Sequence, residues 1–181
     1  MQLKIALTVV FAALAAPSGA QQTRRISSEE LRATCIDNSS ERLEALVARD
    51  WGQLIRLAKR DIALCRPIYS PEEISRIQAF ITLAHSRSGN TREALQTADL
   101  CIRTFYPNTS CHLERSRSLL AIGKLQEGKR SIEVTRRLIE HAREDAKQRI
   151  DALANPSSRD LWVARLDQLG AEAEALEEIG R

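Results

Sequence analysis

The sequence predicts an all-α protein built from antiparallel helix hairpins. Two glycines, Gly89 and Gly123, lie 34 residues apart, and each separates two stretches with helical patterning. Small residues recur around them at the same period: Thr82 and Ser116, Ala94 and Gly128, Cys101 and Thr135. Two helices approach closely only where side chains are small, and the turn between them favours glycine. No segment alternates as a strand would, and aromatic residues make up only 4% of the chain.

The N-terminus has the pattern of a secretory signal peptide. A short basic start precedes an apolar stretch over residues 5–16 and the small-residue ending Ser18-Gly19-Ala20. The apolar stretch is shorter than the roughly 20 residues that a membrane-spanning helix needs, and an uncleaved anchor is the alternative. We expect residues 1–20 to be removed after Ala20, residues 21–27 to be flexible, and the mature protein to be periplasmic or secreted.

Residues 28–181 are predicted to form a single helical domain. Ser27-Ser28-Glu29-Glu30 begins a helix, with serine as the cap and acids in the first turn. A second helix start is predicted at Asn38-Ser39-Ser40-Glu41. Asp50-Trp51-Gly52 then marks a hairpin turn, and the following helix continues to Cys65. Ser70-Pro71 begins the next helix, because serine caps it and proline suits its first turn.

The last two helices are predicted to form a long antiparallel pair. One continues from Gly123 to about residue 154, and a final helix covers 158–180. Apolar residues fall seven apart in the first helix and at steps of four and three in the second, as in a coiled coil. The stripes are Leu125, Ile132, Ile139, Ala146 and Leu153, and Trp162, Leu166, Leu169, Ala173 and Leu176. We expect the two stripes to pack together, with a homodimer through these helices as the alternative.

Four cysteines in an exported chain predict two disulfides, for which three pairings exist. In a helix hairpin, the start of the first helix lies near the end of the second, and Cys35 and Cys65 occupy these positions. Cys101 lies near the end of one helix and Cys111 at the start of the next. We therefore predict the pairs Cys35–Cys65 and Cys101–Cys111. The spacings fit neither a zinc module nor a Cys-x-x-Cys redox pair, so no metal is expected.

Residues 76–107 resemble a tetratricopeptide repeat (TPR), a helix–turn–helix unit with the same period of 34. Thr82, Gly89, Ala94 and Cys101 match the small positions of the family, and Pro107 lies within one residue of its closing proline.

The resemblance extends, in degenerate form, to units at about 39–72, 75–107 and 108–141. In the first unit, Arg49 and Leu54 replace the usual glycine and alanine, and the large family positions are poorly kept. The resemblance implies a right-handed array of hairpins that ends in the long helix pair and is stapled by disulfides.

The resemblance also implies a groove lined by the first helix of each unit. The groove residues would include Arg76, Leu83, Arg87, Leu113, Arg117 and Leu120. Arginines over an apolar floor favour a protein or peptide partner with acidic groups, through charge-assisted bidentate hydrogen bonds. The alternative is a solvated arginine face paired with Glu73 and Glu114.

The sequence contains no recognisable catalytic or cofactor motif. His85, His112 and His141 are the candidate catalytic or metal-binding histidines, and His141 shares a helix face with Glu144 and Asp145. No HExxH motif, P-loop or dinucleotide fingerprint accompanies them.

Two classes of function remain. We expect a non-enzymatic exported scaffold that binds a protein or peptide and needs no cofactor. The alternative is a small helical enzyme or a ligand-binding regulator of the cell envelope. The net charge of +3 is too small to indicate a nucleic-acid partner. Asn38 and Asn108 begin glycosylation sequons, whose use the sequence leaves open.

Overall fold

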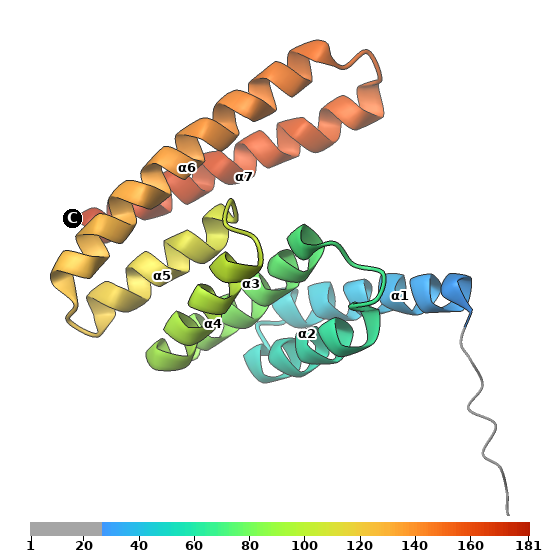
Figure 1. Ribbon diagram of the computed structural model, residues 1–181, viewed down its shortest axis with the longest axis horizontal. Helices are drawn as coiled ribbons and strands as arrows, with labels where there is room; N and C mark the ends of the chain where they lie inside the picture. The colour runs from blue at the N-terminus through green and yellow to red at the C-terminus, as the bar shows by residue number, and fades with distance from the viewer. Residues whose placement is uncertain (1–26) are drawn as a thin grey trace, which may run out of the picture.

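A computed structural model describes residues 27–181, which form seven helices and no strand (Figure 1). The predicted signal peptide and nearly all of the predicted flexible segment therefore lie outside the described residues. Consecutive helices pack side by side as hairpins, and the last two extend well beyond the others. The helices are α1 (Ser28–Val47), α2 (Trp51–Cys65), α3 (Pro71–Arg87), α4 (Thr91–Thr104), α5 (Thr109–Ala121), α6 (Leu125–Ala152) and α7 (Pro156–Gly180).

Helix starts follow the capping residues that the sequence predicts. The Ser27 hydroxyl accepts a hydrogen bond from the Glu30 backbone N–H, and the Glu30 side chain accepts one from the Ser27 N–H. Ser70 and Glu73 form the same reciprocal pair at the start of α3. Each pair satisfies backbone donors that the first helical turn leaves without partners.

The predicted second helix start at Asn38 is wrong, because α1 continues through this position without a break. Asn38 is buried, and its side-chain oxygen accepts a hydrogen bond of 2.7 Å from Arg60 of α2. The asparagine is therefore engaged in packing α1 against α2 and does not cap a new helix. Helix α1 is consequently longer than α3 and α5, the first helices of the next two hairpins.

Three turns with the same hydrogen bonds connect the helices of the three hairpins. In each turn, a residue with positive φ is followed by one whose N–H donates to a carbonyl five residues earlier: Asp50 to Ala45, Asn90 to His85, and Lys124 to Leu119. This is the Schellman pattern of a helix C-terminus. The positive-φ residues are Arg49 (56°), Gly89 (76°) and Gly123 (80°). The three turns therefore fix a common register for α1, α3 and α5.

The small residues that recur with the period of 34 are buried between helices. Ser116 of α5 donates a hydrogen bond of 2.9 Å to the hydroxyl of Ser131 in α6 and lies 3.2 Å from the hydroxyl of Thr135. Small hydroxyl side chains thus join two closely packed helices without leaving their polar atoms unpaired. The other buried members of the pattern are Thr82, Ala94, Cys101 and Gly128.

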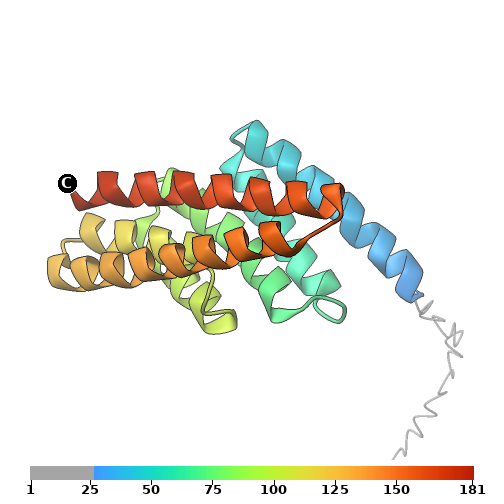
Figure 2. The ribbon, with the colours of Figure 1, turned by 90° about the horizontal axis from the view of Figure 1, so that it is seen from above.

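Helices α6 and α7 run antiparallel as the predicted long pair (Figures 1 and 2). Their buried cluster joins Ile132 and Ile139 of α6 to Leu176 of α7 and also takes in Leu113 of α5. Leu125, predicted in the same stripe, is instead 57% exposed, because it is the first residue of α6. Helix α6 ends at Ala152, two residues before the expected boundary.

Both predicted disulfides are present. Cys35–Cys65 joins α1 to α2 with a Cα–Cα distance of 6.1 Å, and Cys101–Cys111 joins α4 to α5 at 6.2 Å. Both distances lie within the usual range for a disulfide.

Within the described part of the chain, none of the helices is both long enough and apolar enough to span a membrane.

Candidate protein-binding face

The common register of the three turns places equivalent residues on α1, α3 and α5. The positions that lie two, six and thirteen residues before each positive-φ residue fall on one side of these helices. On α1 they are Ile36, Leu43 and Val47; on α3, Arg76, Leu83 and Arg87; on α5, Ser110, Arg117 and Ala121. We call the α1 and α3 members of this set the inner face.

The α1 part of the inner face is apolar and exposed. Ile36 is 69% exposed, Leu43 58% and Val47 77%. Large apolar side chains that gather on one exposed stripe, rather than scatter singly, are typical of an interaction surface. These three residues were not among the predicted groove residues, which were assigned only to the two units that contain Gly89 and Gly123.

The α3 part of the inner face is basic. Arg76 and Arg87 are exposed, and Leu83 between them is half-buried. Arg76 forms an exposed ion pair of 2.5 Å with Glu72, whereas Arg87 has no carboxylate partner among residues 27–181. The inner face therefore consists of exposed apolar positions on α1 and guanidinium groups at the equivalent positions of α3.

The predicted groove residues on α5 are more buried than those on α3. Leu113 is 7% exposed and belongs to the core cluster with α6 and α7, and Leu120 packs against the same cluster. Helix α7 also reaches Ser110, whose hydroxyl donates a hydrogen bond of 2.6 Å to Glu172. Arg117 forms an ion pair with Glu114, a carboxylate that is almost fully buried. Helix α7 thus contacts the α5 stripe at Ser110, whereas Ala121 at the other end of that stripe is exposed.

A buried ion pair joins α1 to α2. Arg42 of α1 and Asp61 of α2 form an ion pair with both side chains buried, and the Tyr69 hydroxyl donates a hydrogen bond of 3.4 Å to Asp61. The Arg42 guanidinium also lies 5.8 Å from the ring centre of Phe80 in α3. Arg42 of α1 therefore contacts side chains of both α2 and α3.

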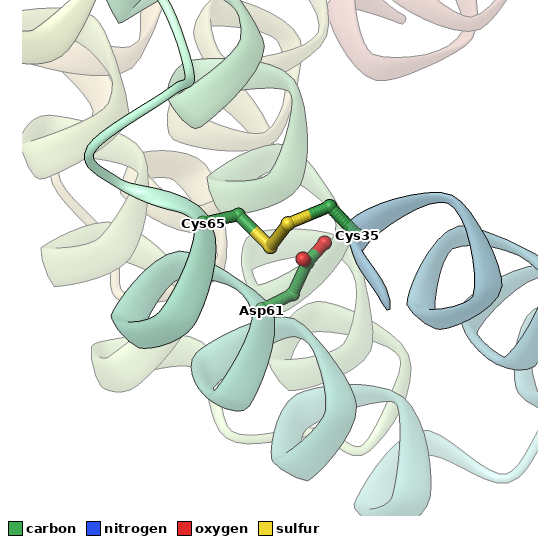
Figure 3. Close-up of side chains that lie close together, drawn as sticks. All are labelled: Cys35, Asp61 and Cys65. Atoms are coloured by element: carbon green, nitrogen blue, oxygen red, sulfur yellow. A yellow bond between two sulfur atoms is a disulfide. The ribbon is translucent and has the colours of Figure 1, made fainter. Parts of the chain in front are cut away.

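Asp61 also lies against the Cys35–Cys65 disulfide (Figure 3). The two sulfur atoms and a carboxylate oxygen lie within 4.8 Å of one another, as the ligands of a metal ion would. Both sulfurs, however, are committed to the disulfide, and a thiolate is the form that binds metal. The carboxylate is already paired with Arg42. The arrangement is that of a structural disulfide.

The three histidines do not come together in one site. His112 is buried; its Nε2–H donates a hydrogen bond of 2.8 Å to the Tyr106 carbonyl oxygen, and burial lowers its pKa below 6.5. His85 is half-buried, and burial together with the nearby Lys59 lowers its pKa. His141 is exposed on α6. Burial therefore favours the uncharged form of both His112 and His85.

Both sequon asparagines are engaged in the folded chain. Asn38 is 5% exposed and binds Arg60. The Asn108 side chain accepts a hydrogen bond from the Cys111 N–H and donates one of 2.8 Å to Ser75. Each amide thus has a structural role in positioning a helix.

Comparison with known proteins identifies the fold. No family model matches the chain, and no curated protein matches it either. Among solved structures, the chain is similar to the complex of the TPR2B domain of yeast Sti1 with pHsp70, with a TM-score of 0.51 and 16% sequence identity. The similarity covers 77% of this chain and 95% of that one. At this identity the likeness concerns the fold, and the helix array is accordingly TPR-like.

Proposed function

We propose that this protein is an exported, non-enzymatic scaffold that holds a segment of a protein partner on its inner face. The observation that carries the proposal is the exposed stripe of Ile36, Leu43 and Val47 on α1, together with Arg76 and Arg87 at the equivalent positions of α3. Burying such side chains against a partner is favourable by roughly 25 cal/mol per Å² of apolar surface. TPR-like arrays in general mediate protein interactions, which agrees with this role.

The charge of the inner face favours a partner segment that carries both apolar and acidic side chains. Arg87 has no carboxylate partner within residues 27–181 and can form charge-assisted hydrogen bonds with one. Arg117 is a poorer candidate for this role, because it already neutralises the buried Glu114. The two disulfides suit an oxidising compartment, which supports export of the protein.

Selection of peptides from a random phage-displayed library on the oxidised protein tests this proposal. Enriched peptides should combine apolar and acidic residues and should bind the variant Leu43→Ser/Arg87→Glu at least tenfold more weakly. Both side chains project from exposed or half-exposed helix positions, so the variant should keep its helical circular dichroism spectrum. The matched control is Arg143→Glu, because Arg143 is an exposed arginine of α6 that forms no ion pair with any of residues 27–181.

Equal binding of the selected peptides to both variants would refute the inner face as the binding surface, as would failure to enrich any peptide. Sedimentation velocity of the unliganded protein measures its oligomeric state and so tests the alternative, in which the protein self-associates. A second copy would dock through the exposed Leu161 and Val163 of α7 and give a dimer that Leu161→Ser disrupts.

A further inference from the structure

A second candidate site lies between α4, α5 and α6. An open cleft with a volume of about 420 Å³ is walled by these helices and by the loop that follows α4. We call it the outer cleft. Its volume lies within the range of small-molecule sites. The lining residues used here are Ile102 and Arg103 of α4, Tyr106 of the loop, and Arg115, Arg130 and Val134 of α5 and α6.

The charges in the outer cleft leave two arginines without partners. Arg115 forms an ion pair of 2.7 Å with Asp99 across α4 and α5, and Glu127 pairs with Lys124 at 3.0 Å. Arg103 and Arg130 also line the cleft, from α4 and α6, and neither has a carboxylate partner in the described chain. Two exposed guanidinium groups therefore border one cleft from different helices.

The cleft lining also contains large apolar and aromatic side chains. Tyr106 is 56% exposed, Val134 is 37% exposed, and Ile102 lines the cleft with them. An exposed ring and two aliphatic side chains can contact the body of a ligand, while the arginines contact an acidic group on it. The cleft therefore combines an apolar floor with a positive border.

The wall formed by α4, the loop and α5 is held in place by several links. The Cys101–Cys111 disulfide spans the loop, and the His112 ring donates a hydrogen bond to the Tyr106 carbonyl. The rings of Tyr106 and His112 also contact each other edge to face, with centres 5.0 Å apart. A wall that is rigid before binding reduces the conformational entropy that a ligand must overcome.

We propose that the outer cleft binds a small organic anion, in which a carboxylate, sulfonate or phosphate is attached to an apolar body. Arg103 and Arg130 bind the acidic group, and Tyr106, Ile102 and Val134 contact the apolar body. This site is separate from the inner face, so a ligand here would accompany the protein-binding role and not replace it.

Two fluorescent probes test the proposal. 8-Anilinonaphthalene-1-sulfonate carries an acidic group on an aromatic body, and N-phenyl-1-naphthylamine is its uncharged counterpart. Fluorescence titration should show that Arg103→Ala/Arg130→Ala weakens binding of the sulfonate at least tenfold and leaves binding of the amine unchanged. Tyr106→Ala should weaken binding of both probes, since it removes the shared apolar contact.

The matched controls lie outside the cleft. Arg87→Ala/Arg143→Ala removes the same charge from the surface, and Leu43→Ser removes an apolar contact of the inner face; neither should change the affinity for the sulfonate. Absence of sulfonate binding would overturn the proposal. So would equal affinities of the wild type and Arg103→Ala/Arg130→Ala, or an equal loss in Arg87→Ala/Arg143→Ala. Failure of the inner face to bind peptides would leave these measurements unaffected.

Discussion

Arg49 has a backbone conformation that glycine occupies at the two equivalent turns. Its φ of 56° lies in the left-handed region, as do the values of 76° at Gly89 and 80° at Gly123. A residue with a Cβ pays about 1–2 kcal/mol in this region, because the Cβ approaches the following carbonyl oxygen. The Arg49 side chain is exposed and forms no ion pair among residues 27–181, so no contact offsets this cost.

Arg49→Gly should therefore stabilise the protein. We expect the free energy of unfolding to rise by about 0.5 kcal/mol, since relief of strain exceeds the added entropy of glycine in the unfolded chain. Gly89→Ala is the reverse change and should cost about 1 kcal/mol, because an added Cβ there would meet nothing within 4 Å and only the backbone is affected. Urea denaturation followed by circular dichroism measures both. A loss of stability in Arg49→Gly would contradict this account of the turn.

At the scale of the helix, α5 and α6 approach each other closely where Gly128 faces Leu120. A Cβ added to Gly128 would lie 2.5 Å from Cδ2 and 2.8 Å from Cγ of Leu120. Both distances are far below van der Waals contact, so the leucine side chain or a helix would have to move. Glycine at this position is therefore required by packing, although it lowers the intrinsic stability of α6.

The effect of Gly128→Ala should change sign with the residue at position 120. In the wild type, the clash should outweigh the helix propensity of alanine and lower the free energy of unfolding by about 1 kcal/mol. In a Leu120→Ala background the clash is absent, and the same change should raise it by about 1 kcal/mol. A double-mutant cycle from urea denaturation gives the coupling energy. The same effect in both backgrounds would show that the two side chains do not compete for space.

How well each element was predicted depends on the range of the interactions that form it. Ser27 and Ser70 cap helices through residues three positions away, so the sequence alone predicts them. Asn38 has the composition of a cap, but a contact with Arg60, 22 residues away, places it inside a helix. Short-range patterns predict where helices begin, and tertiary contacts can overrule them.

The contrast between short-range patterns and tertiary contacts also explains which residues of the candidate site could be predicted. Arg76 and Arg87 were predicted from the unit around Gly89, whose turn residue is easy to recognise. Ile36, Leu43 and Val47 were not predicted in the groove, and the wrong helix start at Asn38 separated Ile36 from the other two. Leu113 was expected in the groove, yet it packs with Leu176, 63 residues later in the chain. No pattern within one unit indicates that a later helix will cover part of its surface.

At the scale of the whole molecule, the two disulfides restrain different parts of the array. Cys35–Cys65 closes a loop with a sequence separation of 30 and fastens α1, whose backbone lies close to α2 but to none of the other described helices. Cys101–Cys111 closes a separation of 10 and joins α4 to α5 inside the array, where both helices have further neighbours. Unequal losses of stability should follow from removing them.

Cys35→Ala/Cys65→Ala should cost about 3.5 kcal/mol and Cys101→Ala/Cys111→Ala about 2.7 kcal/mol, because the longer loop restricts the unfolded chain more. The first variant should also lose hydrogen-exchange protection in the N-terminal half of α1, since α1 then relies on α2 packing alone. Urea denaturation of the oxidised proteins, with hydrogen exchange read by mass spectrometry, measures both effects. A larger loss from removing Cys101–Cys111 would mean that the α4–α5 junction, and with it the wall of the outer cleft, depends on its disulfide more than the first hairpin does.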